Sequence, residues 1–211
     1  NITLSASVLK MYNKIPHYLN EMEKQKKYLT SHSIRNGEVF FFYSFQKLSY
    51  YEITGRFSES VPALRNIERE LNEYESKIGE FQRAILWGSI AIIEFGLANY
   101  KKTIFWLNRI KDELTFSNRP GIRCAIKIFY LIAHYEMGSY DLIPHLTRSI
   151  LWFLQKEEYI YKFEGLILDF FNNKIPKINT NSKKELSAAF QKLKDKVLPL
   201  TKDAYEKNAI E

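Results

Sequence analysis

The sequence predicts an all-α protein, a right-handed α-solenoid of antiparallel helical hairpins with extra N- and C-terminal helices. One pattern recurs three times: a long aliphatic and aromatic run, a small residue, any residue, an aromatic residue, and a second such run. The three turns are Gly55-Arg56-Phe57, Ala98-Asn99-Tyr100 and Gly138-Ser139-Tyr140. Their first residues are 43 and 40 positions apart. Such a period is typical of stacked hairpins, because one hairpin cannot bury its apolar face alone.

The composition also favours long helices. Hydrophobic residues make up 45% and aromatic residues 15% of the chain, against only 8 Gly and 6 Pro, which argues against disorder and against a turn-rich all-β fold. With 211 residues the chain is long enough to bury a core as one domain or one repeat array. The longest apolar stretch, from Ile85 to Ala98, is interrupted by Glu94 and is too short to span a bilayer.

The helices are expected in a definite order. They are one or two helices within about 3–30, hairpins at about 38–76, 80–115 and 120–156, a helix at about 157–172 and a helix at about 185–197. Ile15 and Leu19 share a helical face near the N-terminus, and Asn36 is placed to cap the next helix. Pro120 suits the first turn of the third hairpin.

The C-terminal part is predicted to be a separate segment. The polar run from Asn172 to Asn181 is the best linker candidate, so we expect a repeat array over 1–173 and a linker with capping helices over 174–211. Ser182-Lys183-Lys184-Glu185 has the capping-box pattern. The helix that follows carries Leu186, Phe190 and Leu193 on one stripe, which we expect to pack on the array.

The repeats resemble a known family. The stretch Trp87-Gly88-Ser89-Ile90-Ala91, followed by the turn at Ala98-Asn99-Tyr100, is similar to a tetratricopeptide (TPR) repeat. The resemblance covers about residues 38–156 and is divergent: Thr103 and Ile110 stand where the family has alanine, and the period exceeds the family's roughly 34 residues. The chain looks similar to TPR-like bacterial proteins of unassigned role.

The TPR resemblance implies a concave groove lined by the first helix of each hairpin. The groove positions would be Phe42, Phe45, Ser49, Glu52 and Ile53, then Ile85, Ile92 and Phe95, then Ile128, Ile132, Tyr135 and Glu136. An open apolar groove needs a cover, because soluble proteins rarely expose large apolar patches. Three interpretations remain: the residues are core between repeats, the chain's own 185–197 helix covers them, or a partner helix or peptide binds them.

Three polar residues fall at equivalent places on the first helices: Tyr51, Glu94 and His134. We expect Glu94 to be buried and hydrogen-bonded, with Tyr51 or His134 as partner, because an unpaired buried charge is costly. The favoured interpretation is a structural polar ladder. A ligand or acid–base site is the alternative.

Other chemistries have little support in the sequence. The net charge is +7, but the 31 basic and 24 acidic residues are interleaved, so nucleic-acid binding is not favoured. Neither Cys124 nor the four histidines show metal-ligand spacing, and no phosphate loop or nucleophile elbow is present. We therefore expect no catalytic residue, metal or cofactor. A single cysteine fits a reducing compartment, so a cytoplasmic location is expected.

The expected function is a protein–protein interaction or scaffold module that binds a peptide or helix in an apolar groove. The alternative is the ligand- or peptide-sensing half of a bacterial transcription regulator. For the interaction module the expected partner is a protein or peptide, and for the sensing module the groove is expected to hold a peptide or a small ligand.

Overall fold

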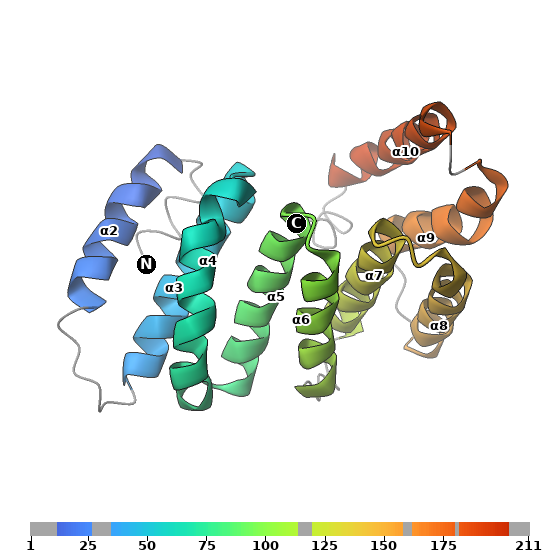
Figure 1. Ribbon diagram of the computed structural model, residues 1–211. Coiled ribbons are helices and arrows are strands. Elements are labelled where there is room, and N and C mark those ends of the chain that lie inside the picture. Colours follow the sequence, from blue (N-terminus) through green and yellow to red (C-terminus); the bar gives the residue numbers. More distant parts are fainter. Residues whose placement is uncertain (1–11, 27–34, 114–119, 158–161, 180–181, 203–211) are drawn as a thin grey trace. The chain divides into compact units, whose positions relative to one another are not determined.

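The computed structural model describes residues 12–26, 35–113, 120–157, 162–179 and 182–202. Over these ranges the chain is helical throughout, with turns and no strand, as the sequence predicts (Figure 1). The chain divides into two compact units, residues 1–115 and 116–211. No helix in the described ranges combines the length and the apolar character that a membrane crossing requires.

The first unit is built around two adjacent helices, α3 and α5. Its elements are η1 (Tyr12–Lys14), α2 (Ile15–Lys26), α3 (Arg35–Thr54), α4 (Phe57–Tyr74), η2 (Glu75–Lys77), α5 (Glu80–Gly96) and α6 (Tyr100–Glu113). Helix α3 packs on α2, α4 and α5, and α5 packs on α6. Leu48, Leu86, Trp87 and Leu107 are among the fully buried side chains. The two hairpins α3–α4 and α5–α6 thus share one core.

The three turns singled out in the sequence adopt one conformation. Gly55, Ala98 and Gly138 all have positive φ angles, of 66°, 58° and 83°. In each turn the N–H of the following residue donates to the carbonyl oxygen four residues before the small residue, for example Asn99 N to Glu94 O at 2.8 Å. This is the Schellman pattern that ends a helix, and a left-handed residue is what it requires. The three small residues therefore mark helix ends because they adopt the left-handed backbone conformation that this pattern requires.

Ala98 is the one alanine among the three turns, and we expect Ala98→Gly to raise the free energy of unfolding by about 1 kcal/mol. The reason is that a Cβ at positive φ is strained, whereas glycine is not. Urea unfolding checks this. The matched control is Gly55→Ala, where nothing lies within 4 Å of an added Cβ. It should lose about 1 kcal/mol, and equal stability of all three proteins would contradict the argument.

The second unit combines one hairpin with three C-terminal segments. Its elements are α7 (Pro120–Glu136), η3 (Tyr140–Leu142), α8 (Ile143–Lys156), α9 (Lys162–Asp169), the π-helical turn η4 (Phe170–Lys174), η5 (Ile175–Lys177), α10 (Lys183–Val197) and η6 (Leu198–Lys202). Leu131, Leu154, Leu168 and Phe171 lie in its core cluster. The core of this unit is therefore formed by residues from α7 to η5.

Helix α10 packs on the second unit as expected. Leu186, Ala189, Phe190 and Leu193 pack against the core cluster while remaining half-buried. The ring of Phe190 lies 4.8 Å from that of Phe170 between centroids. Ser182 caps the helix by accepting from the N–H of Glu185 at 3.4 Å. The amphipathic stripe thus predicted both the helix and the side of it that packs.

Several boundaries differ from the expectation. The division falls at 115/116 instead of 173/174, and the predicted linker begins with ordered turns in which Ile175 is buried. A single apolar side chain anchored in the core outweighs the polar character of its neighbours. Helix α3 begins at Arg35, so Asn36 lies within its first turn instead of capping it. Residues 203–211 of the predicted capping region lie outside the described residues.

Candidate functional site

The first unit carries an apolar surface on α3 and α5. Its residues recur at three- and four-residue intervals on α3, and its two residues on α5 lie seven positions, or about two helical turns, apart. They are Phe42, Phe45, Ser49 and Ile53 on α3 and Ile85 and Ile92 on α5, and we call this surface the α3–α5 apolar face. Phe42, Ile53 and Ile92 expose 44%, 48% and 40% of their surface. Isolated exposed apolar residues are common, but residues grouped on one face indicate a binding surface.

A single carboxylate, that of Glu52, lies at the seam between the two helices. It is hydrogen-bonded with Ser89 of α5. Ser89 is within one helical turn of both Ile85 and Ile92, and Glu52 is within one turn of Ser49, so this bond places the two stripes side by side. The other oxygen of Glu52, Oε1, is buried and has no hydrogen-bond partner within the described ranges. Burial raises the pKa of Glu52 to about 7.

In the second unit, the corresponding positions of α7 are covered. Tyr135 and Ile128 are buried in the core cluster. The ring of Tyr135 lies 5.2 Å from that of Phe171 and 6.1 Å from that of Phe190 on α10. Ile132 packs against the same cluster and is partly buried. Ile128 and Tyr135 therefore do not line an open groove, because the chain's own C-terminal segments occupy that side of α7.

The remaining groove position of the second hairpin, Phe95, is intermediate in character. It is partly buried, and its ring lies 5.4 Å from that of Tyr100 at the turn. Phe95 therefore packs beside the turn at the end of α5. Glu136 of α7 is exposed.

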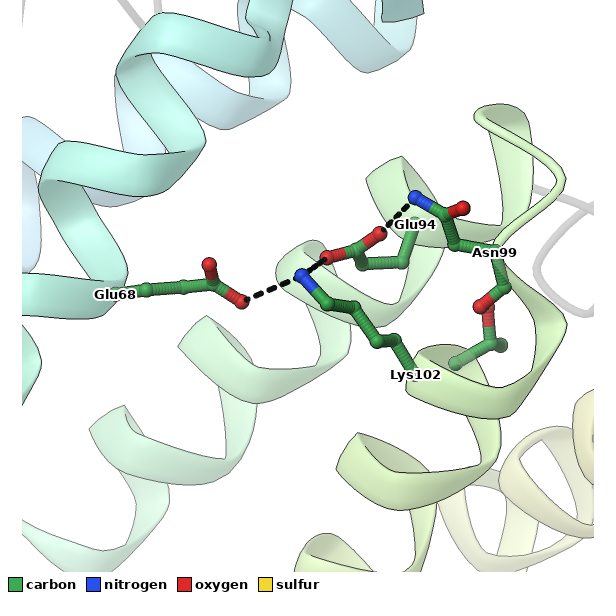
Figure 2. Close-up of polar contacts among 5 residues, drawn as sticks. Glu68, Glu94, Asn99 and Lys102 are labelled. Atoms are coloured by element: carbon green, nitrogen blue, oxygen red, sulfur yellow. Dashed lines mark hydrogen bonds and ion pairs between the residues drawn. The ribbon is translucent and has the colours of Figure 1, made fainter.

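Glu94 forms a polar cluster that joins α4, α5 and α6 (Figure 2). Its side chain is fully buried, with 0% exposed. Asn99 Nδ2 donates to Glu94 Oε2 at 2.7 Å, and Lys102 Nζ donates to Glu94 Oε1 at 2.8 Å. The same Lys102 Nζ lies 3.8 Å from Glu68 Oε1 on α4. A buried carboxylate with two short charge-assisted hydrogen bonds is well satisfied.

The electrostatics of this cluster follow from its hydrogen bonds and from burial. The hydrogen bond to Glu94 is the largest influence on Lys102 and raises its pKa. Burial raises the pKa of Glu68, with Lys102 opposing it. Because the Glu94 carboxylate is sealed from solvent, it is not positioned to contact a solute. We interpret the cluster as a structural element that stabilises the packing of α4, α5 and α6.

The expected partners of Glu94 were wrong. Its hydrogen bonds go to Asn99 and Lys102, five and eight residues later, instead of to Tyr51 or His134. His134 belongs to the second unit, and both of its ring nitrogens are buried without a hydrogen-bond partner among the described residues. Burial lowers the pKa of His134. Tyr51 instead lines a cavity of about 470 Å³ between α2, α3 and α4.

The residues that the sequence analysis missed were Asn99, Lys102 and Glu68. The signal for two of them was present: both follow Glu94 across the turn at Ala98, within one hairpin. The equivalence of positions between hairpins carries no information on contacts across the turn within one hairpin. Glu68 had no such signal, because it reaches the cluster only through the packing of α4.

The other reactive residue types form no cluster. Cys124 is buried, and this burial raises the pKa of its thiol to about 12, so it is a poor nucleophile. Across the described ranges, no three residues among His, Cys, Asp and Glu are grouped as metal ligands would be.

Comparisons with protein-family models, with curated protein sequences and with solved structures found no significant match. Function is therefore inferred from the geometry of this chain.

Proposed function

We propose that this chain is a TPR-like protein-interaction module whose first unit binds an amphipathic helix or peptide of another protein on the α3–α5 apolar face. The observation that carries the proposal is a contrast between the two units. On α7, Ile128 and Tyr135 are buried in the core cluster and the ring of Tyr135 lies 6.1 Å from that of Phe190 on α10, whereas Phe42, Ile53 and Ile92 stay exposed on α3 and α5. Because a helix packs against this side of α7, we infer that the α3–α5 apolar face also binds a helix, supplied by a partner.

The chemistry of α10 indicates what such a partner looks like. Its apolar stripe consists of Leu186, Ala189, Phe190 and Leu193 at helical spacing, and its other positions include five lysines. A helix of this kind buries a narrow apolar stripe and keeps charge in solvent, which is the usual mode of helix recognition by an apolar surface. The exposed stripes of α3 and α5 offer a matching surface.

A peptide-display selection tests the proposal. The immobilised full chain is exposed to a library of 18-residue helix-forming peptides in which one apolar stripe and its flanking polar positions are randomised. We expect enriched peptides to have an apolar stripe and to bind Ile92→Glu at least tenfold more weakly than the wild type, because the new carboxylate would be desolvated by the peptide. Fluorescence anisotropy gives the affinities.

Phe105→Glu is the matched control, because Phe105 is an exposed aromatic residue of α6 outside the α3–α5 apolar face. This variant should bind the selected peptides like the wild type, and circular dichroism should show that both variants are folded. The proposal fails if no peptide is enriched, or if Ile92→Glu and Phe105→Glu bind equally well.

A further inference from the structure

We propose that the partner bound on the α3–α5 apolar face places a cationic side chain, lysine or arginine, against Glu52. This inference rests on the proposed function and names the chemistry of its partner. It is drawn from Glu52, the carboxylate at the seam of an otherwise neutral face.

The hydrogen bonding of Glu52 is incomplete. Ser89 satisfies one part of the carboxylate, and Oε1 is left buried with no partner in the described part of the chain. A carboxylate can accept several hydrogen bonds, and an unsatisfied buried acceptor costs free energy. The side chain is only partly buried. A group arriving on the face can therefore reach the carboxylate after a rotation of its broad terminal torsion.

A purely apolar partner would leave the hydrogen bonding of Glu52 incomplete and bury its carboxylate further. It would remove the remaining solvent from Glu52 and supply no donor, so the carboxylate would be desolvated further. A lysine or arginine supplies both a donor and the opposite charge, which gives a charge-assisted hydrogen bond. The ionised form of Glu52 therefore favours a partner that brings a cation over one that brings only apolar groups.

The electrostatic surroundings of Glu52 are simple. Burial raises its pKa to about 7, and the hydrogen bond with Ser89 opposes this. In the part of the chain that the structure describes, the elements packed on α3, namely α2, α4, η2 and α5, add no charged group that acts on this pKa. A cation from the partner would therefore be the main charge that Glu52 meets.

The test uses the peptides selected above and a double-mutant cycle. We expect enriched peptides to carry a lysine or arginine beside the apolar stripe. Replacing that residue by glutamine should weaken binding to the wild type at least tenfold, and binding to Glu52→Gln by less than threefold. Glu38→Gln, which removes an exposed carboxylate from the same helix, should bind both peptides like the wild type.

The pH dependence supplies an independent readout. A cation lowers the pKa of Glu52 in the complex, so binding below pH 7 requires Glu52 to lose a proton. Affinity for the cationic peptide should therefore rise between pH 6 and pH 8 and level off above, and Glu52→Gln should remove this dependence.

The possible outcomes distinguish failure of this inference from failure of the proposed function. Peptides that bind the face without a cation, or whose cation is not coupled to Glu52, overturn this inference and leave the proposed function standing. Peptides whose glutamine form binds as well as the lysine form show that a neutral donor suffices, which also overturns it. If no peptide binds the face, the proposed function itself fails.

Discussion

Replacing Trp87 by alanine is expected to lower the free energy of unfolding of the first unit by about 3–5 kcal/mol, through lost transfer energy and the cavity left behind. Trp87 exposes only 1% of its surface on α5. The guanidinium of Arg109 on α6 lies over its ring at 4.3 Å from the centroid. The substitution therefore removes the largest fully buried side chain and a cation–π contact together.

Urea unfolding followed by circular dichroism measures this loss. The matched control is Trp152→Ala, because Trp152 is 64% exposed on α8. It should change stability by no more than about 0.5 kcal/mol. Trp87→Phe should lower the free energy of unfolding less than Trp87→Ala does. Phenylalanine keeps most of the buried ring, and no hydrogen bond is lost, because the indole Nε1 has no partner in the described ranges. Equal losses for Trp87→Ala and Trp152→Ala would show that the core is placed wrongly.

Replacing Glu94 by alanine is expected to cost about 3 kcal/mol, because two hydrogen bonds to a charged, fully buried carboxylate are lost and a cavity remains. Glu94→Gln should cost about half as much, since the amide keeps the shape and can still accept a hydrogen bond from Asn99 or Lys102. The order of the two variants is the informative result, and chemical unfolding at pH 7 measures it.

The partner residue offers a second test of the same cluster. Lys102→Met leaves the Glu94 carboxylate buried with Asn99 alone, so we expect a loss of about the same size although Lys102 itself is 57% exposed. Lys101→Met, which removes the exposed neighbouring lysine, should be nearly neutral. If Glu94→Gln proved as damaging as Glu94→Ala, or if Lys102→Met and Lys101→Met were alike, the cluster would not fasten the helices as described.

The local features of this chain could be predicted with some accuracy. The turns at Gly55, Ala98 and Gly138 depend on small residues that tolerate or favour a left-handed backbone, and this requirement is visible in a short stretch of sequence. The packing of the Phe190 stripe on α10 follows from helical periodicity, since the spacing of apolar residues along a helix determines which of its faces packs.

The contacts between elements could not be predicted in the same way. The bond between Glu52 and Ser89 depends on the rotation and register of α3 against α5, which no local pattern specifies. The same holds for the approach of Glu68 to Lys102, because it requires α4 to pack beside α5 at one particular depth. A small rotation of one helix in either pair would change the contact of that pair without changing any sequence pattern.

The sequence by itself determined that this chain is helical and where its helices turn, because backbone conformation and helical periodicity are local properties. Only the tertiary structure decided that α10 covers the side of α7 that carries Tyr135, that Glu94 bonds across its own turn and that the chain divides at 115/116. These outcomes depend on how whole helices fit together, and close packing selects one fit from many that the same local patterns would allow.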